Sequence, residues 1–551
     1  MVVDTPRPRW LKYERLGWWP STSPPVRRQV SFRVFPQKFV SINYTNSKEG
    51  KFLMKQLYSY PCRGVARAAL ALMVVLTIIL AASGPASAQS LFRQLSQDSF
   101  SGGSGQHQSE VEPGAFAYGP TIVAAFQVAR VSSGGGMDIG FATSTNGGIA
   151  WSNGYLPGLT QWYQSNGSTY GAASDASVAY DLKHGMWIIN TIPIAGGVDV
   201  AVSRSTDGLH WDNPIFVNKP GDADKNWIMC DNTSTSPYFG NCYVGWDNSE
   251  IQMTTSTDGG LTWSAPQATA AGDYGIGINP VVQPNGNVVV GFADYNGGMS
   301  AFMSTNGGKS WNAAVSISSA PSHGEAGSLR SAGLPSTAID GAGNVYVSWP
   351  DCRFESGCSA NDIVYSSSAD GIHWSAVVRA PIDPVGSGVD HFIHGLGIDP
   401  KTSGSTAHLA ITYYYYPVSN CGNSCTLFAG YTQSSDGGTT WTAGRQLSGG
   451  MQLSWLPNTF SGRMVADYIA TVFPAGGRAF PIYVIASPTV SGAYRQAVYT
   501  EGYGFTFGGG LEPTFSSADD QPIPDAKSDH PARRPEDRDN LIPGQQPPDR
   551  R

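Results

Sequence analysis

The chain has 551 residues and a formal net charge of −7, with 41% hydrophobic residues and 66 glycines. Residues 1–88 contain 13 basic and 3 acidic residues, so the rest of the chain has 21 basic and 38 acidic residues and a net charge of −17. Such an acidic surface disfavours nucleic acid and anionic membranes as partners.

The N-terminal region has the pattern of a secretory signal peptide that begins at Met54. Lys55, Arg63 and Arg67 precede an apolar run over residues 68–82, and the small residues 86–88 follow as a cleavage site. We therefore expect residues 54–88 to be a signal peptide and residues 1–53 to be a disordered, over-extended N-terminus. The mature chain would be secreted or periplasmic, without a stable membrane anchor. An uncleaved single-span anchor is the alternative, although the apolar run is slightly short for a span.

Six copies of one short pattern run through the middle and second half of the chain. They are STNGGIAW (144–151), STDGLHW (205–211), STDGGLTW (256–263), STNGGKSW (304–311), SADGIHW (368–374) and SSDGGTTW (434–441). The Asp or Asn at the third position can bond to the backbone of its own turn, and the following Gly can adopt a positive φ at little cost. The closing Trp is a large apolar plate that can pack beneath the turn. Each copy therefore predicts a tight β-hairpin, and a calcium-binding role is not needed to explain the Asp and Asn residues.

Runs typical of β-strands surround every copy, for example TIVAAF (121–126), DIGFAT (138–143) and NVVVGF (287–292). Turn residues separate about four such runs in each unit. The closing tryptophans are on average 58 residues apart, so residues 89–500 hold about seven units. This repeat predicts an all-β fold, a seven-bladed β-propeller of four-stranded antiparallel blades, with six blades as the alternative. The last unit shows three strands, and residues 91–100 could supply the fourth.

The six turns and the strand order resemble the Asp-box (bacterial neuraminidase repeat) propellers of the sialidase superfamily. The resemblance covers roughly residues 89–500, and phrases such as WPDCRF (349–354) and RMVADYIATVF (463–473) look like a sialidase-like glycosyl hydrolase branch. It implies that the six copies, which we call octamers although two have seven residues, join the third and fourth strands of each blade. It also implies that ligands bind on the opposite face. We therefore expect residues 89–513 to form the propeller.

Outside the leader, six cysteines remain, and each lies close to one other. Their even number and the predicted export indicate three local disulfides, Cys230–Cys242, Cys352–Cys358 and Cys421–Cys425. A zinc site is the alternative, but no pair has a partner pair nearby in sequence. Residues 514–551 are charged, rich in proline and poor in apolar residues, so we expect a disordered tail.

The loops that follow the second strands and the segments that lead into the first strands should lie on the ligand face. The candidates for catalysis there are Asp351, Arg353, Glu355, Asp390, His391 and Arg463, and those for substrate binding are Arg330, His394, Asp224, Trp227, Tyr295 and Tyr416. Several have a structural interpretation as well. Asp351 and Arg353 could be an ion pair pinned by the Cys352–Cys358 loop. Asp390, His391 and His394 could bind a metal or transfer protons, or could be a hydrogen-bonded loop, and Arg463 could tie the last blade to the first. We expect no metal and no cofactor.

A sialidase needs three arginines that grip the substrate carboxylate, an acid/base carboxyl and a tyrosine nucleophile activated by a glutamate. Three arginines, Arg330, Arg353 and Arg463, stand at suitable positions, and the early Phe-Arg-Ile-Pro type segment of the family is absent from residues 89–500. The sequence therefore predicts a carbohydrate-active, glycosidase-like protein with an incomplete sialidase set. The alternative is a non-catalytic module that binds an extracellular glycan or protein, and a lyase or other hydrolase on the same scaffold is a third hypothesis. We expect a monomer.

Overall fold

The structure is a computed structural model, and it describes residues 28–34, 38–44, 92–219, 221–248, 250–507, 514–516 and 520. The chain divides into two compact units, Met1–Ser87 and Ala88–Arg551. In the first unit, β1 (Arg28–Val34) pairs antiparallel with β2 (Lys38–Tyr44), within the segment expected to be an over-extended terminus. The expected signal peptide at residues 54–88 lies outside the described residues.

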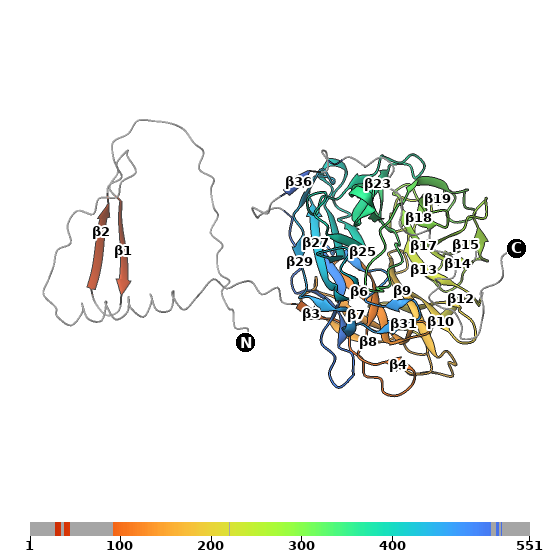
Figure 1. Cartoon of the computed structure of the whole chain (residues 1–551). Coiled ribbons are helices and arrows are strands. Elements are labelled where there is room, and N and C mark those ends of the chain that lie inside the picture. The colour runs from red at the N-terminus through yellow and green to blue at the C-terminus, as the bar shows by residue number, and fades with distance from the viewer. Residues whose placement is uncertain are drawn as a thin grey trace, which may run out of the picture. The chain divides into compact units, whose positions relative to one another are not determined.

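The second unit is all-β and is built of short antiparallel strands in sheets that follow one another along the chain (Figure 1). The first set of strands is β5 (Val111–Tyr118), β6 (Thr121–Val131), β7 (Gly136–Ser144) and β8 (Ser152–Tyr155), and the second is β9 (Ala172–Asp181), β10 (Met186–Ile194), β11 (Val200–Ser205) and β12 (Ile215–Asn218). The third set is β13 (Asp224–Cys230), β14 (Cys242–Asn248), β15 (Glu250–Ser256) and β16 (Gln267–Ala268). The fourth set is β17 (Gly275–Val282), β18 (Val288–Asp294), β19 (Gly298–Ser304) and β20 (Val315–Ser319). The first two sets join through one register pair between β7 and β9, so they count as a single larger sheet.

The remaining sets complete this unit. They are β21 (Ser336–Ile339), β22 (Val345–Asp351), β23 (Asp362–Ser368) and β24 (Val378–Arg379); β25 (Asp390–Ile398), β26 (Leu409–Tyr416), β27 (Thr426–Ser434) and β29 (Arg445–Gln446); and β33 (Ala470–Val472), β34 (Phe480–Ala486), β35 (Gln496–Glu501) and β3 (Phe92–Gln94). Short strands β4 (Gly105–Gln106) and β30 (Met451–Gln452) add to the edges of two sheets. These four-stranded antiparallel sheets are consistent with the propeller expected from the sequence.

The last sheet is completed by the start of the described chain. β3 pairs antiparallel with β35, with Phe92 opposite Glu501 and Arg93 opposite Thr500. The sequence predicted this pairing from the missing fourth strand of the last unit. One hydrophobic cluster also joins side chains of β6 to those of β34, so the first and last sheets share a core.

All six copies form turns of one kind between the third and fourth strands of their sheets, and in the two seven-residue copies the turn is one residue shorter. In the copy at residues 256–263, the Ser256 hydroxyl accepts the Gly260 N–H at 2.9 Å, and Asp258 Oδ1 accepts the N–H groups of Leu261 and Thr262 at 3.0 and 2.9 Å. Corresponding bonds to the serine hydroxyl recur in the other copies. Side-chain acceptors within the turn thus bind the backbone N–H groups that a tight turn leaves without a backbone acceptor.

The hydrophobic core lies between neighbouring sheets. One such cluster packs Ile188 and Val202 against Val244 and Trp246. Burial of both faces of inner strands explains their nearly continuous apolar runs, because each face contacts another sheet.

Three disulfides are present, Cys230–Cys242, Cys352–Cys358 and Cys421–Cys425, as the sequence predicted. Within the described residues, no helix is long and apolar enough to cross a membrane.

The described residues of the range 514–551, which composition predicts to be a disordered tail, include a short strand. β36 (Thr514–Ser516) pairs with β28 (Thr440–Thr442), which follows directly from the last octamer turn. Asp520 lies 3.2 Å from the guanidinium of Arg379. An open strand edge and a buried cation therefore hold these few tail residues, which composition alone does not indicate.

Candidate functional site

The first strands of five strand sets, β5, β9, β13, β17 and β25, carry a bulge near their start. Register shifts occur at these points, and each bulge contains a residue with positive φ. These residues are Glu112 (φ 52°), Asp175 (50°), Lys225 (44°), Gly277 (72°) and Ile393 (43°). Non-glycine residues adopt this conformation at a cost, so its recurrence points to a specific structural demand.

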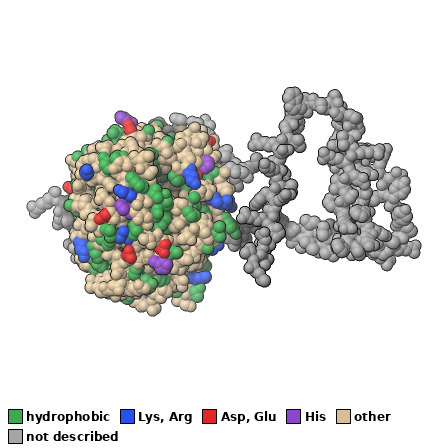
Figure 2. Space-filling view, turned by 180° about the vertical axis from the view of Figure 1, so that it is seen from behind, with side chains coloured by type: hydrophobic (Ala, Val, Ile, Leu, Met, Phe, Trp, Pro, Cys, Tyr) green, Lys and Arg blue, Asp and Glu red, His purple; other side chains and the backbone are tan. Residues whose placement is uncertain are grey.

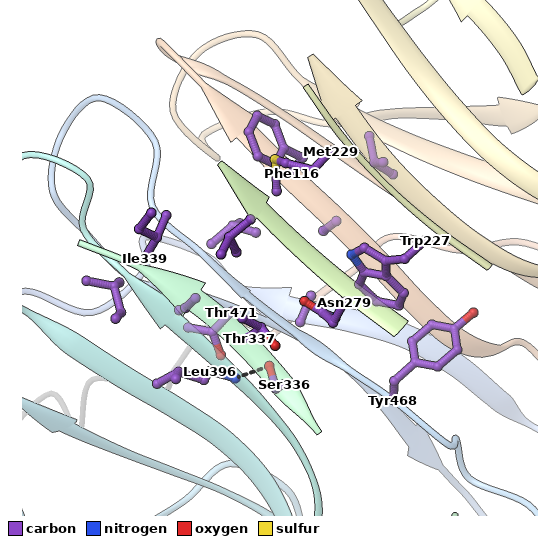
Figure 3. Close-up of a pocket in the computed structure, with 18 of the residues that line it drawn as sticks. Phe116, Trp227, Met229, Asn279, Ser336, Thr337, Ile339, Leu396, Tyr468 and Thr471 are labelled. Carbon is purple, nitrogen blue, oxygen red and sulfur yellow. Dashed lines mark hydrogen bonds between the residues drawn. The ribbon is translucent and has the colours of Figure 1, made fainter. Parts of the chain in front are cut away.

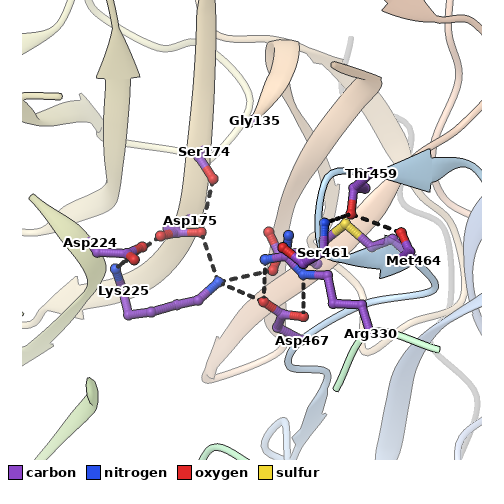
Figure 4. Close-up of polar contacts among 12 residues, drawn as sticks. Gly135, Ser174, Asp175, Asp224, Lys225, Arg330, Thr459, Ser461, Met464 and Asp467 are labelled. Carbon is purple, nitrogen blue, oxygen red and sulfur yellow. Dashed lines mark hydrogen bonds and ion pairs between the residues drawn. The ribbon is translucent and has the colours of Figure 1, made fainter. Parts of the chain in front are cut away.

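The bulges bring three charged side chains together into a cluster with Arg330 and Asp467 (Figure 4). Lys225 Nζ lies 3.1 Å from Glu112 Oε1, 3.5 Å from Asp175 Oδ1 and 3.0 Å from Asp467 Oδ2. Arg330 donates to both oxygens of Asp467, from Nε at 2.9 Å and from Nη2 at 2.6 Å. All five side chains are at most 4% exposed. We call these residues the central charged cluster.

Further hydrogen bonds fix the carboxylates of the central charged cluster. The Lys225 N–H donates to Asp175 Oδ2 at 3.0 Å and to Asp224 Oδ1 at 2.9 Å. Gln127 donates to Glu112, and the Ser174 hydroxyl donates to Asp175 Oδ1 at 2.9 Å. Buried charges are tolerated only when they are paired and hydrogen-bonded in this way.

The protonation of the cluster follows from burial and from the two cations. Burial raises the pKa of Glu112 to about 7, although the Lys225 ammonium opposes the rise. Burial also acts on Asp467, but Arg330 and Lys225 outweigh it and hold the pKa of that carboxyl far below its usual range. Burial lowers the pKa of Lys225, and the surrounding carboxylates raise it well above the usual value. Asp467, Lys225 and Arg330 therefore stay charged at neutral pH, while Glu112 can hold a proton.

A short hairpin lies beside this cluster (Figure 4). It consists of β31 (Asn458–Thr459) and β32 (Gly462–Arg463). The Arg463 N–H donates to the Ser328 carbonyl at 2.9 Å, and the Phe460 N–H donates to the Ser132 carbonyl at 3.3 Å. Met464 accepts from Arg130 Nε at 2.9 Å. The hairpin is thus anchored to segments from different parts of the fold, and the cluster is closed off from solvent.

A cavity of about 360 Å³ adjoins the cluster (Figure 3). The first strands of all the sheets, β5, β9, β13, β17, β21, β25 and β33, contribute to its lining. Trp227 and Tyr468 stand nearly perpendicular at its edge, with ring centroids 5.3 Å apart. Lys225 Nζ lies 5.6 Å from the Tyr468 ring, so the cation links the cluster to the cavity.

Asp351, Arg353 and Glu355 lie away from this centre. Arg353 donates from Nε and Nη2 to the Asp351 carboxylate at 2.8 and 2.7 Å and also reaches the Ser318 hydroxyl at 3.1 Å. The Glu355 carboxylate accepts the Gly386 N–H at 2.9 Å. These contacts match the structural interpretation, an ion pair in the loop closed by the Cys352–Cys358 disulfide.

Asp390, His391 and His394 are held by polar contacts on β25. Asp390 Oδ1 accepts from the backbone and side chain of Asn361 at 2.8 and 3.0 Å. His391 Nδ1 lies 3.2 Å from the Asn361 carbonyl, and burial lowers its pKa. His394 Nε2 lies 2.7 Å from the Ser348 hydroxyl, and burial lowers its pKa to about 4. Both rings are therefore neutral near pH 7.

Asp362, Asp383 and His391 offer ligand atoms within 4.8 Å of one another. The guanidinium of Arg379 already contacts two of them, with Nε 2.7 Å from Asp362 and Nη2 2.9 Å from Asp383. An arginine in this position competes with any metal cation for the same carboxylates, so we assign no metal to this group.

The other candidates are scattered over the fold. Tyr295 donates to Asp247 Oδ2 at 2.6 Å, and Tyr416 donates to the Ala326 carbonyl at 3.3 Å. Arg463 Nη1 donates to the Leu453 carbonyl at 3.1 Å. Of the predicted residues, Arg330 belongs to the central charged cluster, Asp224 bonds to Lys225, and Trp227 and His394 line the adjoining cavity.

Sequence reasoning missed Glu112, Asp175, Lys225 and Asp467 as a group. The signal that could have found three of them is their equivalent place at the start of the first strand in successive units. Lys225 also stands between the predicted residues Asp224 and Trp227.

The surface drawn in Figure 2 is mixed. Acidic, basic and apolar side chains are interspersed on this face, without a continuous basic area. This agrees with the net negative charge of the chain beyond residue 88.

No protein-family model matches the chain, and no curated protein matches it. Among solved structures, a protein of unknown function from Dyadobacter fermentans is similar at 16% identity and a TM-score of 0.41, over 59% of this chain and 94% of that one. The NanB sialidase from Streptococcus pneumoniae shows 14% identity and a TM-score of 0.35, over 74% of this chain and 69% of that one. An intramolecular trans-sialidase from Ruminococcus gnavus shows 13% identity and a TM-score of 0.36, over 74% and 96%. Likenesses this distant do not assign an activity to the chain.

Proposed function

We propose that this protein is a secreted, sialidase-like Asp-box propeller of seven blades that recognises an extracellular glycan or protein without hydrolysing it. The ring would be closed by β3, which pairs with the last sheet. The cavity lined by the first strand of every sheet supports this closed arrangement, because first strands surround the axis of a propeller. Recognition would use the face opposite the octamer turns.

The pairing of the two central cations, Arg330 and Lys225, with internal carboxylates favours recognition over sialidase chemistry. Arg330 is bidentate to Asp467, and Lys225 contacts three carboxylates. An arginine that grips a substrate carboxylate must offer its two donors to that ligand. Here an internal carboxylate takes this place, and the other two arginine candidates bond elsewhere. The geometry therefore supports binding without the carboxylate grip of a sialidase.

The test combines a binding assay with an activity assay on the secreted chain. Purified protein is screened on an array of extracellular glycans and proteins, and separately with fluorogenic glycosides that include a sialoside. We expect saturable binding to at least one immobilised ligand and no turnover of any glycoside. Turnover of a sialoside, or the absence of binding to every ligand, would overturn the proposal.

Hydrolysis remains the second candidate because of Tyr468. Its hydroxyl has no partner among the described residues, and it lies at the cluster that contains Glu112. A tyrosine next to a glutamate is the nucleophile pair of the sialidase type. If any glycoside is turned over, Tyr468→Phe should abolish turnover while Tyr503→Phe, at an exposed position, should leave it unchanged.

Export is part of the proposal. The three disulfides and the finding on membrane-crossing helices are compatible with an extracellular protein. N-terminal sequencing of protein from the culture medium should begin at Gln89. A mature chain that begins at Met1, or one retained in the membrane fraction, would contradict the predicted cleavage.

A further inference from the structure

The residues that line the cavity differ in their exposure to solvent. At the starts of the first strands, Glu112, Asp175 and Lys225 are at most 4% exposed. Further along the same strands, the lining residues Phe116, Tyr118 and Met229 are half-buried. Solvent therefore reaches the cavity at the ends of the first strands. At their starts the charged side chains are buried, whereas the lining residues Trp227 and Gly277 are half-buried.

The open end lies on the same side as the octamer turns. In an antiparallel four-stranded sheet, the connection from the first to the second strand and that from the third to the fourth lie at the same end. The octamers join third and fourth strands, and each first strand ends where the first connection begins. The cavity thus opens on the octamer face, opposite the face used in the proposed function.

The cavity wall combines apolar side chains with polar groups that lack partners. Phe116, Met229 and Leu396 supply apolar surface (Figure 3). Asn226 Oδ1 and the Tyr468 hydroxyl have no hydrogen-bond partner among the described residues, although these residues are only 1% and 7% exposed. Buried polar atoms are almost always satisfied by protein, water or ligand.

The inner strands add a second set of polar groups. β13, β17, β21 and β33 each stand at the end of the strand order of their sheet. A strand at a sheet edge leaves a row of backbone N–H and C=O groups unpaired on its outer side. These edges border the cavity, so a bound molecule can form hydrogen bonds along one wall while it contacts apolar side chains on another.

The charge of the lining restricts the ligand. Lys225, the cation in the lining, is neutralised by three carboxylates, and burial lowers the pKa of the lining residue His394 to about 4. A ligand with a formal charge would lose its hydration without gaining an opposite charge. The volume of about 360 Å³ lies at the small end of the range for ligand pockets.

We propose that this axial cavity is a binding site for a small, uncharged molecule with an apolar body and a hydrogen-bonding group at one end. The molecule enters from the octamer face, places its polar end towards Asn226 and Tyr468, and lays its apolar body along Phe116 and Met229. The opening described here lies on the face opposite the one used for recognition in the proposed function.

The experiment uses the secreted chain and the neutral fluorescent probe N-phenyl-1-naphthylamine, which has an apolar body and one N–H donor. We expect a saturable rise in probe fluorescence with one site per chain, unchanged by added salt. Ala117→Trp on β5 and Ala470→Trp on β33 insert a bulky ring from two different walls of the cavity, and each should weaken binding at least tenfold. Ala150→Trp, at an exposed position in an octamer turn, is the matched control and should bind the probe like the original chain.

Each outcome decides the matter. Non-saturable binding, or equal affinity in both cavity variants and the control, would overturn the proposal. Folding of the variants is checked by the thermal unfolding midpoint, and if one variant does not fold, the other carries the comparison. If neither folds, the Trp227→Phe variant provides the readout. The bound probe should quench less of the tryptophan emission in this variant than in the original chain. An equal loss of emission in both would refute the site. Binding of a glycan or protein on the array should persist in the cavity variants. A failure of the proposed function can therefore be told apart from a failure of the cavity proposal.

Discussion

Replacing Lys225 with methionine tests whether the central charged cluster stabilises the fold. The change keeps the length and most of the volume of the side chain but removes an ammonium that contacts Glu112, Asp175 and Asp467 at 3.1, 3.5 and 3.0 Å. Asp467 keeps Arg330, whereas Glu112 and Asp175 lose a cation. Removal of one partner from a buried ion pair costs about 3–5 kcal/mol, and we expect a loss of this size at pH 8.

The pH dependence of this loss separates electrostatics from packing. In the variant, Glu112 loses the ammonium that opposes the effect of burial, so its pKa should lie further above that of the unfolded chain. Its protonated form then favours folding at low pH, and this contribution disappears as the pH rises through the folded pKa. The destabilisation should therefore be smaller at pH 5 than at pH 8.

The assay is equilibrium urea unfolding followed by tryptophan fluorescence, with the disulfides intact, at pH 5 and pH 8. Lys309→Met, at an exposed position in an octamer turn, is the control and should change the unfolding free energy by no more than about 0.5 kcal/mol. A loss below about 1 kcal/mol at pH 8, or an equal loss at both pH values, would refute the reasoning for Lys225.

Two further predictions concern local stability. Asp258→Ala removes an acceptor of two backbone N–H groups in an octamer turn and should lower the unfolding free energy by about 1–2 kcal/mol, whereas Thr257→Ala at the exposed neighbour should have little effect. Equal urea midpoints for the two variants would count against the turn as a stabilising device. Burial raises the pKa of Glu110 from 4.5 to about 8, so this carboxyl favours folding at low pH and loses that contribution as the pH rises through about 8. Glu110→Gln should therefore reduce the fall in stability between pH 5 and pH 9, and an unchanged pH profile of the unfolding free energy would argue against it.

Features that depend on neighbouring residues could be predicted from the sequence. The serine, the aspartate or asparagine and the glycine of each octamer turn lie within five positions of one another, and their bonds are made within the turn. The disulfides join cysteines 4 to 12 positions apart. The ion pair between Asp351 and Arg353 is equally local. In each case the chain has little freedom to place the partners elsewhere.

The candidate site could be predicted only in part, because its contacts are between distant segments. Lys225 and Glu112 are 113 positions apart, and Arg330 and Asp467 are 137 positions apart. No spacing rule connects such pairs, so Arg330 was identified by its place before a first strand while its carboxylate partner was not. The bulges that turn Glu112, Asp175 and Lys225 inward also have no sequence signature, since these residue types rarely adopt positive φ.

The amino-acid sequence by itself determined the repeated turns, the all-β character, the local disulfides and the need for an outside strand to complete the last sheet. These follow from short-range bonding and from the period of the repeat. The tertiary structure alone decided which charges meet, and it pairs Arg330 and Lys225 with internal carboxylates instead of leaving them exposed. It also formed the cavity that the first strands line. Both depend on how the first strands of distant units are brought together. Burial there favours ion pairs such as those of Lys225 and Arg330 with internal carboxylates.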